Sequence, residues 1–235
     1  MIHAIPHASI GRTGAARLLP AARSTLLLPL LPLLLLSACG SSDDQPGEPA
    51  PPALRVTELA PGAYAVATGD AANPSSGTYY RSADGSRLLV LDDSAGQASA
   101  MYRRDGNGGW QGAPGSAAGT TVDLLNSSAI PAAALAVAPF AGSYAVRLAD
   151  RTVALFSVTA GGDLVAGGTA CRLTGKVAPS VLPNALKLTL ATAGCGDLPA
   201  QSDGYLVADT DHAPAAFRLV APGKSAPVDL WAFRE

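Results

Sequence analysis

Histidine, charged residues and aromatic residues are all scarce in this chain of 235 residues. The sequence has 3 histidines, 14% charged residues and 5% aromatic residues, and only His212 lies beyond the N-terminal region. One histidine excludes metal sites built from several imidazoles. The other candidate ligands, two cysteines far from this histidine, make a weak set, so we predict no metal site.

Basic residues are also too few for a nucleic-acid partner. The segment before Cys39 holds three arginines and no acidic residue, which leaves 13 of the 16 basic residues against all 18 acidic residues in the remainder. The remainder therefore has a formal net charge of −5. Nucleic acids require a basic surface, so we predict that this protein binds none.

Signature motifs of common enzymes are absent as well. The chain has no Gly-x-Ser-x-Gly, no Ser-x-x-Lys and no glycine-rich phosphate loop between a strand and a helix. Most aspartates stand beside Gly, Ser or another Asp, where turn chemistry accounts for them. We therefore predict no catalytic residues and no cofactor.

The longest apolar run, Leu26 to Leu36, is short. About 11 to 13 residues do not comfortably span a bilayer as a helix, and Pro29 and Pro32 interrupt helical hydrogen bonding. Basic residues precede the run and small residues follow it, which is the layout of a secretory signal peptide. We predict a signal peptide over residues 1–38.

The end of this segment, Leu36-Ser37-Ala38-Cys39, resembles the lipobox of bacterial lipoproteins. The resemblance implies cleavage before Cys39, lipidation of its thiol and acylation of its amine, with palmitate-like chains as the membrane partner. Gly40 rather than Asp follows, which in this family implies export to the outer membrane. The resemblance covers residues 1 to about 40, and leaves open whether the protein faces the periplasm or the cell surface.

Residues 39–53 follow as the lipidated cysteine and a tether rich in Gly, Ser, Asp and Pro. They contain no aliphatic side chain larger than Ala after Cys39, so we expect them to be disordered. At roughly 3 Å per residue the tether would reach up to about 40 Å from the membrane.

From residue 54 to 235 the pattern indicates an all-β body with little or no helix. Short alternating runs, such as Leu186, Leu188 and Leu190 around polar residues, are separated by turn signals such as Asp84-Gly85. This spacing predicts an antiparallel β-sandwich or a small β-barrel. The one helix candidate is Ala129 to Val137, of one or two turns. The other expected strands are residues 78–81, 87–91, 100–103, 120–125, 143–148, 151–158, 173–177, 204–207, 216–220 and 228–233.

A weak internal repeat suggests two related β-units, at 54–138 and 139–235. Gly77-Thr-Tyr79 matches Gly142-Ser-Tyr144 at an offset of 65, which aligns Leu88 with Val153 and Val90 with Leu155. If the repeat is real, these four aliphatic residues should face inward. The alternative is a chance match between alternating strands.

Cys171 and Cys195 remain once Cys39 is lipidated. An even pair of cysteines in an exported protein most often forms a structural disulfide, and no Cys-x-x-Cys is present to suggest redox chemistry. We predict that these two are bonded, with a stabilisation of roughly 3 kcal/mol from closing the loop.

Two polar segments could form functional sites, but each can also be explained as an ordinary loop or turn. Asp209-Thr-Asp211-His212 offers carboxylate and imidazole ligands, but is also a plausible solvated loop between two strands. Asp105 to Trp110 begins like a calcium loop, yet Gly109 and Trp110 occupy the fifth and sixth positions, so a hairpin turn is favoured. Trp110 and Trp231 fit either core packing or a sugar-stacking surface.

These features favour an outer-membrane-anchored lipoprotein with a non-catalytic β binding domain. The partner would be an envelope protein, a surface or host ligand, or a small apolar molecule held in a barrel mouth. One alternative is an inhibitor of an envelope-attacking lysozyme or protease, which would present the loop Asp105 to Trp110. A hydrolase is a third alternative and would need several polar groups converging in one pocket.

Overall fold

The computed structural model describes residues 53–116, 119–208 and 212–235. The predicted signal peptide, Cys39 and all but the last residue of the tether lie outside the described residues, as do Asp209 and Asp211. The described body is all-β, as predicted, and includes a short 3-10 helix, η1 (Ala138–Phe140).

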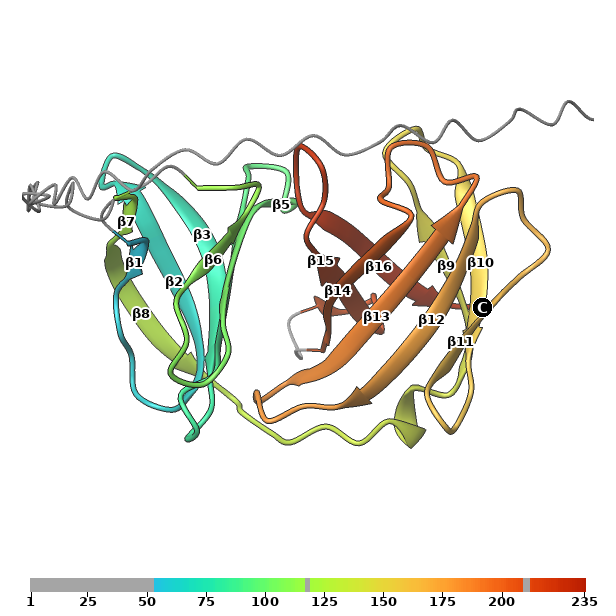
Figure 1. Ribbon diagram of the computed structural model, residues 1–235, viewed down its shortest axis with the longest axis horizontal. Helices are drawn as coiled ribbons and strands as arrows, with labels where there is room; N and C mark the ends of the chain where they lie inside the picture. Colours follow the sequence, from blue (N-terminus) through green and yellow to red (C-terminus); the bar gives the residue numbers. More distant parts are fainter. Residues whose placement is uncertain (1–52, 117–118, 209–211) are drawn as a thin grey trace, which may run out of the picture. The chain divides into compact units, whose positions relative to one another are not determined.

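The first part of the body contains a six-stranded antiparallel sheet in the order β6-β5-β4-β3-β2-β8 and a two-stranded parallel pair, β1 and β7 (Figure 1). Consecutive strands β2 to β6 form a meander, and β8 returns to pair with β2. The strands are β1 (Arg55–Val56), β2 (Gly62–Asp70), β3 (Asn73–Arg81), β4 (Arg87–Asp92), β5 (Ala98–Arg104), β6 (Gln111–Ala113), β7 (Thr121–Val122) and β8 (Leu124–Ile130).

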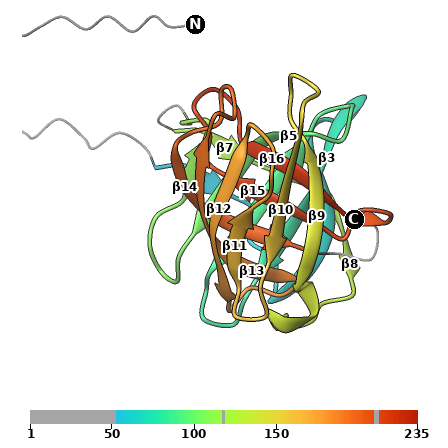
Figure 2. The same ribbon diagram turned by 90° about the vertical axis from the view of Figure 1, so that its right-hand side faces the viewer.

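The second part is a closed antiparallel barrel of eight strands, which settles the choice between sandwich and barrel for this part (Figure 2). Each strand pairs with the next, and β16 pairs with β9 to close the ring. The strands are β9 (Gly142–Arg147), β10 (Val153–Val158), β11 (Asp163–Ala166), β12 (Arg172–Pro179), β13 (Ala185–Ala193), β14 (Gln201–Val207), β15 (Phe217–Ala221) and β16 (Val228–Arg234).

The barrel interior is a packed apolar core. Leu186, Leu188 and Leu190 of β13 all point into it and are buried, as their alternation predicts. Phe217 is fully buried in this core, with its ring centroid 4.6 Å from that of Tyr144. Side chains therefore fill the inside of this barrel, as is usual at eight strands.

The six-stranded sheet is buried on both faces along β4 and the second half of β3. Tyr79 and Leu89 belong to the cluster on one face, which the β1 and β7 segments cover through Val56 and Val122. The opposite face packs against outward-facing barrel residues in a second cluster; its buried members are Ala63, Tyr80, Leu88, Val90, Ala98, Met101, Ala113, Leu182, Ala185, Tyr205, Val207 and Val220.

The connection between the two parts is extended, not helical as predicted for Ala129 to Val137. Residues 129–130 belong to β8 and residues 131–136 have no regular structure. Asn184 explains why, because its side chain accepts a hydrogen bond from the Ala133 N–H and donates one to the Pro131 carbonyl. Its backbone N–H also donates to the Ala133 carbonyl, so the segment finds its partners on the barrel rather than within a helix.

The proposed repeat alignment is wrong in register. Gly77 lies inside the second strand of its meander, whereas Gly142 begins the first strand of the barrel. The aligned aliphatic residues also differ, because Val153 is 47% exposed and β10 points Ala154, Phe156 and Val158 inward instead.

A different match fits the observed strands. Gly62-Ala-Tyr-Ala-Val66 begins β2 and Gly142-Ser-Tyr-Ala-Val146 begins β9, at an offset of 80. Both glycines have a positive φ, +151° and +147°. Each strand is the first of its sheet along the chain and pairs with the final strand of that sheet, β2 with β8 and β9 with β16. This match is consistent with two related units, each with a Gly-x-Tyr-Ala-Val strand at its start.

Candidate functional site

A cavity of about 1000 Å³ opens at one end of the barrel. Its walls come from the β9–β10 hairpin, the β13–β14 loop and the β15–β16 loop, with a contribution from the β4–β5 turn. These barrel loops meet at one end because alternate connections of an up-and-down barrel lie at the same end. The cavity continues from this end onto the outer surface of β9, β10 and β16, where Ala145, Val153 and Phe233 line it.

The outer wall of the cavity is apolar and exposed. Val153 and Phe233 are 47% and 41% exposed, and both are among the few large exposed apolar residues of the described chain. Ala145, which pairs with Phe233, and Trp231 lie on the same outward-facing side of the strands, because strand residues alternate between the two faces. Exposed apolar side chains gathered in a concave surface are typical of a ligand-binding site.

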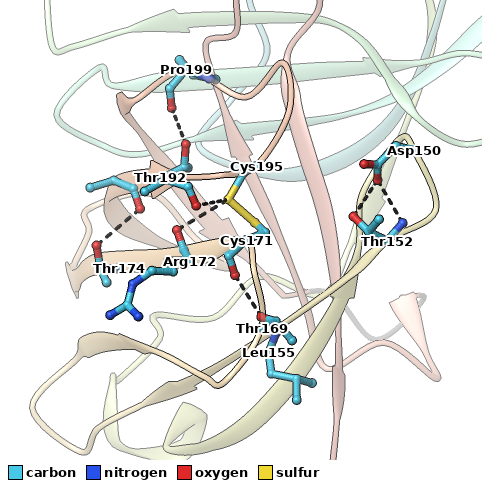
Figure 3. Close-up of a disulfide and its surroundings, with 12 residues drawn as sticks. Asp150, Thr152, Leu155, Thr169, Cys171, Arg172, Thr174, Thr192, Cys195 and Pro199 are labelled. Atoms are coloured by element: carbon cyan, nitrogen blue, oxygen red, sulfur yellow. Dashed lines mark hydrogen bonds between the residues drawn. A yellow bond between two sulfur atoms is a disulfide. The ribbon is translucent and has the colours of Figure 1, made fainter. Parts of the chain in front are cut away.

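The disulfide predicted from the sequence shapes one wall of this cavity. Cys171 and Cys195 are bonded, with their Cα atoms 4.5 Å apart. Figure 3 shows the bond between the segment that enters β12 and the β13–β14 loop, where the hydroxyl of Thr192 donates to the Pro199 carbonyl. Cys195 and its neighbours Gly196 to Leu198 line the cavity, so the bond fixes the position of a wall segment.

Behind Trp231 lies a buried ionic group that sequence reasoning missed. Arg218 of β15 donates two hydrogen bonds to Asp229, at 2.6 Å and 2.8 Å, and one to Asp92, at 2.8 Å. The guanidinium also lies 4.6 Å from the centre of the Trp231 ring. Asp229 accepts a further bond from the Ala98 N–H at 2.7 Å, so the group joins the barrel to the β4–β5 region.

Burial sets the protonation behaviour of this group. Burial raises the pKa of Asp92 above its usual value, and the hydrogen bond and charge of Arg218 only partly oppose this effect. Burial alone would lower the pKa of Arg218, but the hydrogen bonds and charges of Asp229 and Asp92 raise it well above its usual value. Arg218 is therefore a permanent buried cation shared between two carboxylates.

The remaining candidates from the sequence are placed as follows. His212 packs edge-on against Trp231, with ring centroids 4.9 Å apart, whereas its two neighbouring aspartates lie outside the described residues. Trp231 lines the cavity. Trp110 packs against Tyr79 on the face of the sheet covered by β1 and β7, with ring centroids 6.5 Å apart.

Sequence reasoning found the disulfide but not the cavity. Cysteine number and compartment suggested the bond, whereas Val153 and Phe233 carry no motif and reach the same cavity wall only because β10 and β16 both pair with β9. Within residues 53–116, 119–208 and 212–235 no group of three or more His, Cys, Asp or Glu side chains is placed to hold a metal ion. Over the same ranges, no helix is long and apolar enough to cross a membrane.

Fold and cavity together define an all-β protein with a filled eight-stranded barrel and an open apolar cavity at the barrel end. A comparison of the chain with protein-family models, with curated proteins and with solved structures finds no match in any of the three.

Proposed function

We propose that this protein is an outer-membrane lipoprotein, anchored through Cys39, whose β body binds a small apolar molecule in the cavity at the barrel end. The observation that carries the binding proposal is the cavity itself, with an apolar wall formed by the exposed Val153 and Phe233 and the half-buried Trp231. A volume of about 1000 Å³ matches that of sites for small molecules.

The packed barrel interior directs such a ligand to the cavity rather than to the barrel centre. Tyr144 stacks on Phe156, and Phe217 packs edge-on against both rings, so these side chains fill the interior. The ligand would lie across the end and outer wall of the barrel, with aliphatic or aromatic groups on Val153 and Phe233. The charged residues at the rim, among them Arg147, Asp150 and Arg151, would hold its polar edge in water.

The neutral fluorescent probe N-phenyl-1-naphthylamine tests the binding site. The full chain should bind it, and Val153→Ser should weaken binding about threefold to tenfold, because the substitution removes about 1 kcal/mol of apolar contact. Val165→Ser is the matched control, since Val165 is 49% exposed on the neighbouring strand β11 and does not line the cavity. Equal weakening by both substitutions, or no probe binding by the unaltered chain, would contradict the proposal.

Fatty-acid labelling in cells tests the anchor separately. Cys39→Ser should abolish the label and the partitioning into a detergent phase, because the thiol is the acceptor of the lipid. A chain with Cys171→Ser and Cys195→Ser should keep the label. Labelling of the Cys39→Ser chain would contradict the proposed lipid anchor and would leave the proposed binding site untouched.

The inhibitor alternative receives less support from the described residues. It requires the loop Asp105 to Trp110 to present a charged or aromatic anchor to an enzyme. Trp110 instead packs on Tyr79, so the aromatic group is held by the sheet rather than offered at the loop tip. We therefore favour small-molecule binding over enzyme inhibition and over hydrolysis.

A further inference from the structure

Three arginines stand side by side on one face of the six-stranded sheet. Arg81 ends β3, Arg87 begins β4 and Arg104 ends β5, and the strand register pairs Arg81 with Arg87 and Arg87 with Arg104. We call these three residues the arginine row. They share a face with Tyr79, because residues two apart in a strand point the same way.

Without a negatively charged partner, this arrangement of three arginines would destabilise the folded protein. Like charges directly opposite each other on neighbouring strands are destabilising. Arg87 is also buried, with a side chain only 6% exposed. Within the described ranges Glu58 is the carboxylate that bridges the row, and it contacts all three guanidinium groups. One carboxylate leaves two positive charges of the row uncompensated.

The row also has more hydrogen-bond donors than acceptors. The Nε atoms of Arg81, Arg87 and Arg104 are all buried and have no hydrogen-bond partner among the described residues. Buried donors without acceptors are rare because each costs free energy, so this cluster points to an additional group rich in acceptor oxygens.

We propose that the arginine row is a binding site for a phosphate group, in which Glu58 acts as an exchangeable resident carboxylate. A phosphate monoester carries a charge near −2 and three acceptor oxygens, which matches three guanidinium groups better than a single carboxylate does. Glu58 is suited to leave, because its side chain is 46% exposed and it lies in the strandless connection between β1 and β2. The site is separate from the cavity and does not depend on the function proposed for it.

Phosphate titration of the full chain, followed by thermal unfolding at constant ionic strength, tests this site. Glu58→Gln removes the competing charge and keeps the shape, so the affinity for inorganic phosphate should rise about tenfold, the effect of about 1.4 kcal/mol. Adding Arg104→Gln to that variant should reverse most of the gain. Because a ligand that binds the folded state raises the unfolding temperature, each affinity can be read from the shift.

Arg172→Gln is the matched control, because it makes the same charge change at an exposed position on the barrel. Combined with Glu58→Gln it should leave the phosphate shift unchanged. Glycerol phosphate should act like inorganic phosphate if the site accepts a headgroup ester, whereas a shift with inorganic phosphate alone identifies a site for the free ion. The proposal is overturned if acetate stabilises the Glu58→Gln chain as well as phosphate does, if phosphate stabilises none of the chains, or if the Arg172 control loses the shift as fully as Arg104→Gln does.

Discussion

The two parts of the body use similar meanders but close them differently. In the barrel, β16 pairs with β9 and no strand edge remains, so aromatic and aliphatic side chains fill a continuous interior. In the first part β8 also returns to its first strand, but β6 and β8 do not pair. In the six-stranded sheet, the face that corresponds to the barrel interior is covered by β1 and β7. The arginine row lies at one end of this face. Closure therefore favours a wholly apolar interior, whereas the open meander keeps room for buried charge.

The largest expected effect concerns the barrel interior. Phe156→Asp should unfold the barrel, because an unpaired buried charge costs about 3 to 5 kcal/mol or more against a total stability of about 5 to 15 kcal/mol. Its neighbour Leu155 points outward, so Leu155→Asp should cost far less. Urea unfolding of the two chains measures the difference, and equal losses would mean that the inward face of β10 is misassigned.

Arg218→Met should have the next largest effect. The substitution leaves Asp229 and Asp92 buried without their cation, at a cost of about 3 to 5 kcal/mol. Because Arg218 joins β15 and β16 to the β4–β5 region, both parts should lose stability together. Arg172→Met, at an exposed arginine, should change the free energy of unfolding little. Selective loosening of only one part in hydrogen exchange would show that the ionic group does not couple them.

Removing the disulfide should destabilise the barrel more than the six-stranded sheet. Replacing Cys171 and Cys195 by Ala should cost roughly 3 kcal/mol, because the unfolded chain regains the freedom of the closed loop. Hydrogen exchange should speed up in β12 and β13 more than in β3 and β4. A uniform acceleration would show that the barrel and the sheet open as one unit.

The matched glycines test the revised repeat. Gly62→Ala and Gly142→Ala should each cost about 1 to 3 kcal/mol, since both positions require a positive φ that suits glycine. An added Cβ would lie 3.3 Å from the Tyr64 ring and 3.1 Å from the Arg234 guanidinium, respectively. Gly168→Ala, where the added Cβ meets no atom within 4 Å, is the control. Clearly unequal costs at the two matched sites would argue against their equivalence.

The smallest predicted effect is a dependence on pH. Because burial raises the pKa of Asp92 in the folded protein, the stability linked to this group is complete below its unfolded pKa and declines as pH rises through the folded value. Asp92→Asn should remove this decline in the window just above pH 3.8. Unfolding curves of both chains across that window provide the measurement, and identical pH profiles would contradict the assignment.

The parts of this structure that follow local patterns could be predicted from the sequence. Alternation located β13 through its three leucines, and cysteine pairing located the disulfide. Strand β2 was missed because Gly62 to Asp70 is mostly Ala, Gly and Thr, with too little contrast between its faces. The helix expected after Ala129 was wrong because Asn184, more than 50 residues away, supplies the hydrogen bonds that a helix would have made internally.

Arg218 and the arginine row show the same limit for the candidate sites. These arginines lie in four different strands, and only the pairing of strands places Arg81, Arg87 and Arg104 together or brings Asp92 to Arg218. Such sites depend on register across a sheet, which no spacing along the chain reveals.

Asn184 has a consequence for the integrity of the chain. A connection between two folded parts is ordinarily the place where a protease cuts, because its backbone can enter an active site in extended form. Here Pro131 and Ala133 are held to the barrel by three hydrogen bonds with Asn184. A protease would have to break these bonds before the backbone could enter its active site. One buried asparagine should therefore protect the junction against cleavage.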